Sequence, residues 1–132
     1  MTSLHNLPYF LSYFGAALVL LAVFLAIYTR ITRHDEWALL HQGNTAAAIS
    51  LAGAALGFAL PLASVIAHAA SFLDLLVWAV MAMVVQLLAY ALIYAIRRDV
   101  STAITRGEMA PAVMLAAGGV VCGILNAACL TY

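Results

Sequence analysis

Residues 72–96 read FLDLLVWAVMAMVVQLLAYALIYAI, and this stretch decides the fold class. A helix that crosses a membrane needs about 20 mainly apolar residues, because the hydrocarbon core is about 30 Å thick and each residue adds about 1.5 Å. The only charged side chain in the stretch is Asp74, which stands near its start, within reach of the membrane interface. We therefore predict a transmembrane helix over 72–96.

Three more stretches have the same character: 9–28, 45–66 and 109–132. None of them contains a charged residue, and none alternates strictly between polar and apolar residues as the strands of a membrane barrel do. Over the 132 residues, 67% are hydrophobic and 8% are charged, whereas about a quarter of the residues are charged in a soluble domain. The chain is therefore predicted to be an all-α membrane protein with four transmembrane helices.

The arginines predict how the chain is oriented. All five cationic side chains follow the first or the third predicted span: Arg30, Arg33, Arg97, Arg98 and Arg106. Short loops rich in arginine stay on the cytoplasmic side of the membrane. Loops 29–44 and 97–108 are therefore predicted to be cytoplasmic, and both termini periplasmic. A formal net charge of +0 offers no basic surface for a nucleic-acid partner.

The first loop also carries Asp35, Glu36 and Trp37. Gly43 is expected to end its short turn in a left-handed conformation, and Asn44 is placed to accept a hydrogen bond at the start of the second span. Two interpretations follow from this composition. The loops form either a docking face for a cytoplasmic partner or only anchors that hold two hairpins at the interface.

The two halves of the chain resemble each other at an offset of 64 residues. Three pairs of loop residues match: Arg33 with Arg97, Asp35 with Asp99, and Gly43 with Gly107. Glu108 takes the place of Asn44, with a negative charge at the start of the fourth span. The match favours a duplication, with 1–66 and 67–132 as two parallel helix–loop–helix repeats. The alternative is that any two alanine-rich hairpins align this well.

Small residues recur at every fourth position on the second and fourth spans. The two ridges consist of Gly53, Gly57 and Pro61, and of Gly119, Gly123 and Ala127. Lipid gives helices no hydrophobic reason to associate, so close approach through glycine is a main source of attraction. We predict that the ridges pack these two helices against each other, either within one chain or between two copies.

Polar residues also occur inside the spans. Gln86, Tyr90 and Tyr94 share one face of the third span, and Asn126 lies in the outer half of the fourth. Such side chains either form hydrogen bonds between helices or line a path for a small solute. The span centres carry no Asp, Glu, Lys, Arg or His, the residues with which coupled transporters bind their ion. Coupled transport is therefore disfavoured, and a passive pore built from several copies remains an alternative.

No residue pattern points to an enzyme. The four histidines lack the spacing of metal ligands, and the sequence contains no nucleophile–base arrangement or phosphate-binding loop. Cys122 and Cys129 are seven positions apart, about 10.5 Å along a helix, which is too far for a disulfide between them. No catalytic residue, metal site or cofactor is predicted.

Several segments carry a resemblance to a known family: 27–37, 44–47, the ridge from Gly53 to Pro61-Leu62, 86–88 and 126–129. Together they resemble the YjfL-like family of uncharacterised bacterial inner-membrane proteins, which are built from a duplicated two-helix unit. The resemblance covers essentially the whole chain. It implies a four-span protein of the bacterial cytoplasmic membrane with no assigned activity. Some relatives are encoded beside phage-shock-type proteins, which implies a link to envelope stress.

These observations lead to two hypotheses of different class. The first is a structural or accessory membrane protein that self-associates and offers its arginine loops to a cytoplasmic membrane-stress protein. The second is a passive oligomeric channel or carrier for a small solute or ion, with the polar span residues along its route.

Overall fold

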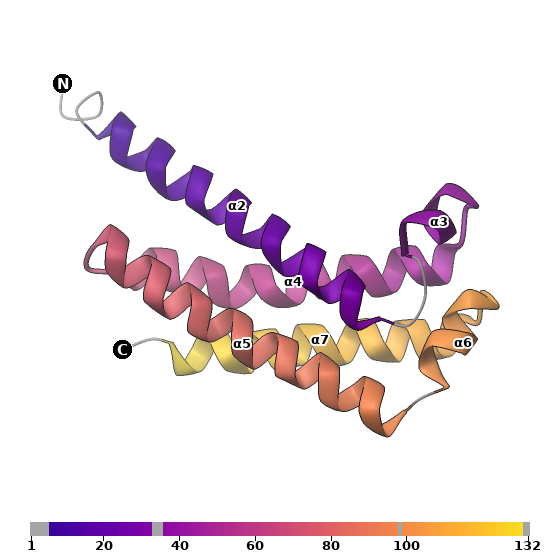
Figure 1. The fold of residues 1–132 in the computed structure, drawn as a ribbon. Helices are drawn as coiled ribbons and strands as arrows, with labels where there is room; N and C mark the ends of the chain where they lie inside the picture. The colour runs from indigo at the N-terminus through magenta and orange to yellow at the C-terminus, as the bar shows by residue number, and fades with distance from the viewer. Residues whose placement is uncertain (1–5, 33–35, 98, 131–132) are drawn as a thin grey trace.

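The computed structural model describes residues 6–32, 36–97 and 99–130, and the part of the chain so described is helical, without strands. The helices, shown in Figure 1, are α2 (Leu7–Ile31), α3 (Glu36–His41), α4 (Thr45–His68), α5 (Phe72–Ile96), α6 (Val100–Thr105) and α7 (Met109–Cys129).

Four of these helices, α2, α4, α5 and α7, are long and apolar enough to cross a membrane. The prediction of an all-α, four-span chain is confirmed. The observed helices α2 and α4 are longer than the predicted spans 9–28 and 45–66, because each continues into polar residues that flank its apolar core. Helical backbone satisfies its own N–H and C=O groups, and this advantage persists into the interface. At the other end of the chain, α7 stops at Cys129, and 131–132 lie outside the described residues.

Helix α4 is the central element of the bundle. It contacts α2, α5 and α7, and its contact with α7 is the most extensive in the molecule. In its most apolar stretch 44% of the residues are buried, against 6% in α2. Figure 1 shows α4 and α7 side by side and running in the same direction, with α2 and α5 running the opposite way. The chain is therefore organised around one pair of parallel helices.

Glycine allows this pair to approach until the backbones touch. A Cβ atom at Gly123 would collide with the carbonyl oxygen of Gly57, and one at Gly57 would lie 2.6 Å from the carbonyl oxygen of Gly119. One at Gly53 would collide with Ala116. Pro61 is buried one turn further along α4. The two predicted ridges thus face each other within a single chain.

Aromatic rings join α2 to the rest of the bundle at its loop end. Phe24 stacks on Phe58 of α4 with ring centroids 4.7 Å apart, and Tyr28 meets the ring of Tyr90 of α5 edge-on at 4.8 Å. All four side chains are buried. Aromatic side chains bury a large area each, so these two contacts account for much of the packing between α2 and the bundle.

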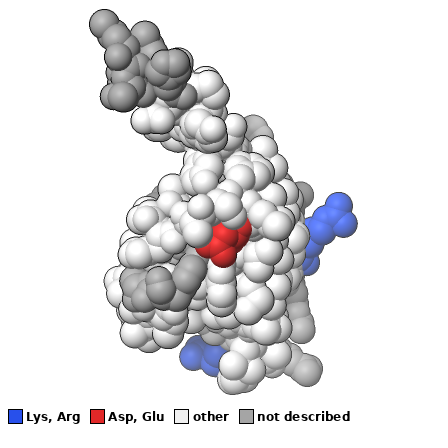
Figure 2. All heavy atoms as spheres, turned by 90° about the vertical axis from the view of Figure 1, so that its left-hand side faces the viewer, with Lys and Arg blue, Asp and Glu red and all other residues white. Residues whose placement is uncertain are grey.

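The outer half of α2 leaves the bundle (Figure 1). Many of its apolar side chains are exposed, as Tyr9 at 70% and Val19 at 62% illustrate, and Phe10 stacks on Phe14 of the same helix. The ring of Tyr13 faces the other way and meets that of Phe72 of α5 edge-on, with ring centroids 5.8 Å apart. A surface of this kind requires lipid or another protein around it. Figure 2 views the molecule from the end where this half lies; most of the surface there is uncharged, with one acidic patch near the middle and basic side chains only at the margin.

The two short helices α3 and α6 lie together at the other end (Figure 1), and both end in the same way. Gly43 and Gly107 each have φ +78°, which confirms the left-handed conformation predicted for Gly43. The Gly43 N–H donates to Leu40 and the next N–H to Leu39, a pattern repeated at Gly107 with Ile104 and Ala103. The shared geometry agrees with the duplication, which itself stays a prediction.

The contact between α4 and α7 yields a matched pair of substitutions. Alanine is favoured over glycine by about 1 kcal/mol in a helix, so Gly118→Ala, whose new Cβ meets no atom within 4 Å, is expected to stabilise the protein slightly. Gly123→Ala inserts a Cβ against the rigid backbone of α4 and is expected to cost about 1–3 kcal/mol. Unfolding in detergent measures both changes. Equal effects of the two substitutions would contradict the close contact.

Candidate functional site

Gln86 occupies the junction of three helices. It lies in the middle of α5 with no exposed surface, and its Nε2 donates a hydrogen bond of 2.9 Å to the carbonyl oxygen of Gly119 on α7. A Cβ at Gly57 of α4 would lie 2.8 Å from the same nitrogen. Glycine at position 57 therefore makes room both for α7 and for the carboxamide. We call Gly57, Gln86 and Gly119 the glutamine junction.

Tyr90 lies one turn further along α5 and packs on Gly119 of α7. A Cβ at Gly119 would overlap the Tyr90 hydroxyl, and the side chain is 1% exposed. Tyr94, one turn beyond, is also buried. The polar face predicted for α5 thus points into the bundle rather than toward lipid.

Two polar atoms at this place have no hydrogen-bond partner within the described chain: Oε1 of Gln86 and the hydroxyl of Tyr90. Both residues line a cavity of about 40 Å³ between α5 and α7, together with Ala89, Ile93, Gly118, Gly119 and Cys122. Buried polar groups in native proteins are almost always paired, so these two atoms require an explanation.

Asn126 and Ser64 extend the set of interhelical hydrogen bonds. Nδ2 of Asn126 on α7 donates to the carbonyl oxygen of Ala82 on α5 at 3.1 Å. Oγ of Ser64 on α4 donates to the carbonyl oxygen of Ala127 on α7 at 3.0 Å. The sequence analysis did not identify Ser64, although it follows Gly57 by seven positions and so shares its helix face.

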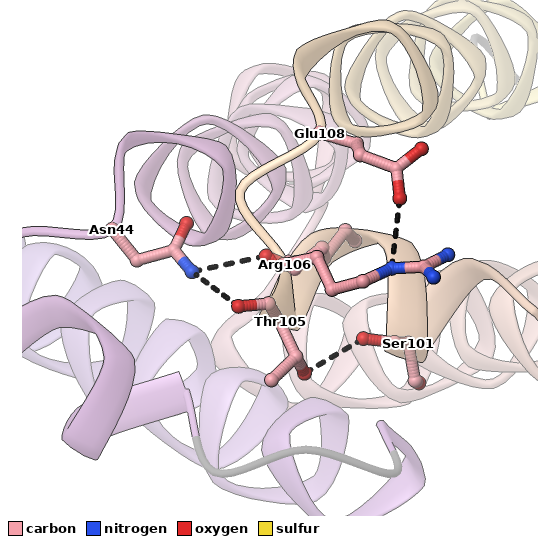
Figure 3. Close-up of polar contacts among 6 residues, drawn as sticks. Asn44, Ser101, Thr105, Arg106 and Glu108 are labelled. Carbon is pink, nitrogen blue, oxygen red and sulfur yellow. Dashed lines mark hydrogen bonds and ion pairs between the residues drawn. The ribbon is translucent and has the colours of Figure 1, made fainter.

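At the loop end, Asn44 connects the two halves of the chain (Figure 3). Its Oδ1 accepts a hydrogen bond of 3.0 Å from the N–H of Ala47, which confirms its predicted place at the start of α4. Its Nδ2 donates to the carbonyl oxygens of Ile104 and Thr105, at 3.0 and 3.3 Å. This second contact is long-range in sequence, and the spacing of residues did not predict it.

Glu108 differs from Asn44, its counterpart in the alignment. It stands just before α7 but makes no capping hydrogen bond, and its Oε2 pairs with Nε of Arg106 at 2.9 Å instead. Figure 3 shows the glutamate turned toward this arginine. The Glu108 carboxylate can interact either with the Arg106 guanidinium or with the N–H groups at the start of α7. It pairs with Arg106, because a full positive charge attracts it more strongly than the partial charge of a helix end.

The arginine loops are exposed where the structure describes them. Arg30 and Arg106 are exposed, and Arg97 pairs with Asp99 at 3.5 Å with both side chains largely in solvent, so this pair contributes little to stability. Trp37 is 54% exposed. Glu36 begins α3, and the other predicted loop residues lie outside the described residues: Arg33, Asp35 and Arg98.

Two larger hollows lie near this end. A cleft of about 370 Å³ between α5, α6 and α7 is lined by Arg97, Ile93 and further apolar residues of all three helices. A groove of about 460 Å³ separates the two glycine turns. Among the described residues, no group of three or more His, Cys, Asp or Glu could hold a metal ion.

Comparison with known proteins identifies relatives over the full length of the chain. The model of the family described as Domain of Unknown Function (DUF350) matches residues 1–130. The chain is 35% identical over 132 residues to the UPF0719 inner membrane protein YjfL of Escherichia coli strain K12, with 100% of both chains covered. The protein of the same name from Escherichia coli O157:H7 matches equally. No solved structure matches the chain.

The contrast between Asn44 and Glu108 can be tested directly. Asn44→Ala removes a capping bond and the link to α6, and loss of a cap alone costs about 0.5–2 kcal/mol. Glu108→Ala removes only an exposed ion pair, worth about 0–1 kcal/mol. Unfolding in detergent should therefore report the larger loss for Asn44→Ala, and hydrogen exchange in α6 should rise in that variant alone. A larger loss for Glu108→Ala would contradict this assignment.

Proposed function

The chain belongs to the DUF350 family of inner-membrane proteins, and from this premise we propose that it is a structural or accessory component of the membrane rather than an enzyme. It is a multi-pass inner-membrane protein with four apolar helices. Beyond this location, the bundle serves in our proposal as a scaffold that associates with copies of itself and with a protein at its loop end.

One observation carries the proposal: the polar side chains inside the spans are used to hold helices together. Gln86 and Asn126 each donate to a carbonyl oxygen of the facing helix. Interhelical hydrogen bonds of this kind contribute about 0.6–2 kcal/mol each. The span centres carry no Asp, Glu, Lys, Arg or His, the residues with which coupled transporters bind their ion. These features support a static bundle.

Self-association requires a surface other than the glycine ridges, because α4 and α7 use those within one chain. The outer half of α2 offers one. Gly15 has no atom within 4 Å of the place where a Cβ would be, and the exposed Ser12 stands one turn before it on the helix. Small residues of this kind allow a second helix to approach closely in lipid. We infer that two copies meet along this half of α2.

The loop end supports the second part of the proposal. Helices α3 and α6 lie together there, Trp37 is half exposed, and Arg30, Arg97 and Arg106 reach solvent (Figure 1). By the positive-inside rule we infer that this end is cytoplasmic and that both termini are periplasmic. A cytoplasmic membrane-stress protein is the partner that we propose for this surface.

A passive channel or carrier is the competing function. Its route would follow Gln86, Tyr90, Tyr94 and Asn126, which all lie inside the bundle. The two amide groups that would line the route already donate to backbone, which favours the structural role. The two functions differ in a property that can be measured, the flux of solute through a bilayer that contains the protein.

Crosslinking in membranes tests self-association. In a chain whose two cysteines are replaced by serine, Ser12→Cys is expected to form a disulfide-linked dimer on mild oxidation. Val121→Cys on α7 is the control, because this residue faces lipid at 56% exposure away from α2. Dimer formation through position 121 and not through position 12 would place the interface elsewhere.

Reconstitution in liposomes tests the structural role against the channel. The wild-type protein is expected to leave the flux of small ions and neutral solutes at the level of empty liposomes. Gln86→Leu and Asn126→Leu should instead lower the free energy of unfolding by about 0.6–2 kcal/mol each, since each removes one interhelical hydrogen bond. A flux through the wild-type protein that either substitution abolishes would favour the channel.

A further inference from the structure

We propose that the cavity beside the glutamine junction is a hydrated site in the middle of the membrane, in which a water molecule donates a hydrogen bond to Oε1 of Gln86 and accepts one from the hydroxyl of Tyr90. The site is distinct from the scaffold role proposed above. It would exist whether or not the protein self-associates.

The first argument is the cost of leaving these two atoms unpaired. Gln86 is fully buried and Tyr90 is 1% exposed, and neither Oε1 nor the hydroxyl has a partner in the described chain. An unpaired buried polar group costs about 1–3 kcal/mol, and in a bilayer core no bulk water is present to reduce that cost. Two such groups at one place therefore call for a shared partner.

The second argument is the chemistry of the two atoms. Nε2 of Gln86 donates to the carbonyl oxygen of Gly119, and turning the amide over would set two oxygens against each other, so Oε1 must be the atom left over. A carboxamide oxygen only accepts, whereas a phenol hydroxyl donates and accepts. The missing partner must therefore supply at least one O–H or N–H and one lone pair.

The third argument is size. The cavity measures about 40 Å³, and a water molecule needs roughly 10–15 Å³ of such space, so the cavity holds water and excludes an acyl chain or a larger solute. Gly118 and Gly119 are among the residues that line it. Ile93 also lines the larger cleft that includes Arg97.

Water is thus the one abundant molecule that meets all three requirements. The site would join α5 to α7 beside the direct bond from Gln86 to Gly119. Cys122 lies in the wall of the cavity, so its environment should be wet, whereas the apolar side chains on the lipid side of the same helices should be dry.

Solid-state NMR of the full chain in lipid bilayers can detect this water directly. Magnetisation that starts on water is expected to reach the Gln86 side chain and Cys122 several-fold faster than Leu88, which is 63% exposed to lipid on α5. Transfer to Gln86 as slow as transfer to Leu88 would overturn the proposal.

Two variants test whether the side chains of Gln86 and Tyr90 hold the water or whether water only penetrates the bundle nonspecifically. Tyr90→Phe and Gln86→Leu each remove one of the two hydrogen-bonding groups and keep a side chain of similar volume, and either is expected to abolish the fast transfer to Cys122. Fast transfer that persists in both variants would show that these groups do not hold the water. Spectra of the remaining α5 and α7 residues report whether each variant keeps the fold.

Discussion

The structure depends on the backbone contact between α4 and α7. In lipid, apolar side chains gain nothing by leaving the solvent, so a helix pair must be held by close packing and by interhelical hydrogen bonds. Gly57 and Gly123 remove the side chains that would separate the two backbones, and Gly119 stands at the same interface. Helix α4 then becomes the surface on which the other two spans pack. A parallel pair of this kind also brings the two short loop helices together at one end of the bundle (Figure 1).

The same contact explains where polar residues are tolerated. The carboxamide of Gln86 lies in the space left by Gly57 and Gly119, where a carbonyl oxygen is within reach. Asn126 and Ser64 likewise bond to carbonyl oxygens of neighbouring helices. Each of these side chains would be costly against lipid, and each connects two spans instead. Helix α2 packs on the bundle through the rings of Phe24 and Tyr28, and it is the span that the bundle buries least.

Three features of the molecule bear on its function: the loop end, the outer half of α2, and the cavity beside Gln86 and Tyr90. The loop end carries the arginines and the exposed Trp37, whereas the opposite end is mostly uncharged apart from one acidic patch (Figure 2). The outer half of α2 is apolar and is exposed on much of its surface. The cavity beside Gln86 and Tyr90 contains two buried polar atoms that have no hydrogen-bond partner in the described part of the chain. The proposed scaffold role, the proposed self-association and the proposed hydrated site each rest on a different one of these features.

The sequence alone determined the number and type of the spans, because hydropathy and length are properties of each segment by itself. It also determined the glycine turns, since Gly43 and Gly107 reach a positive φ without the cost that other residues carry. The cap at Asn44 is local in the same sense. For the ridges, the pattern of glycines predicted a close contact but left its partner undecided.

Only the tertiary structure decided which groups meet. That both ridges face each other in one chain, that Gln86 donates to Gly119, and that Asn44 reaches Ile104 and Thr105 are contacts between residues far apart in the sequence. The departure of α2 from the bundle belongs to the same class. Such contacts depend on how whole helices are placed, and no single segment carries that information.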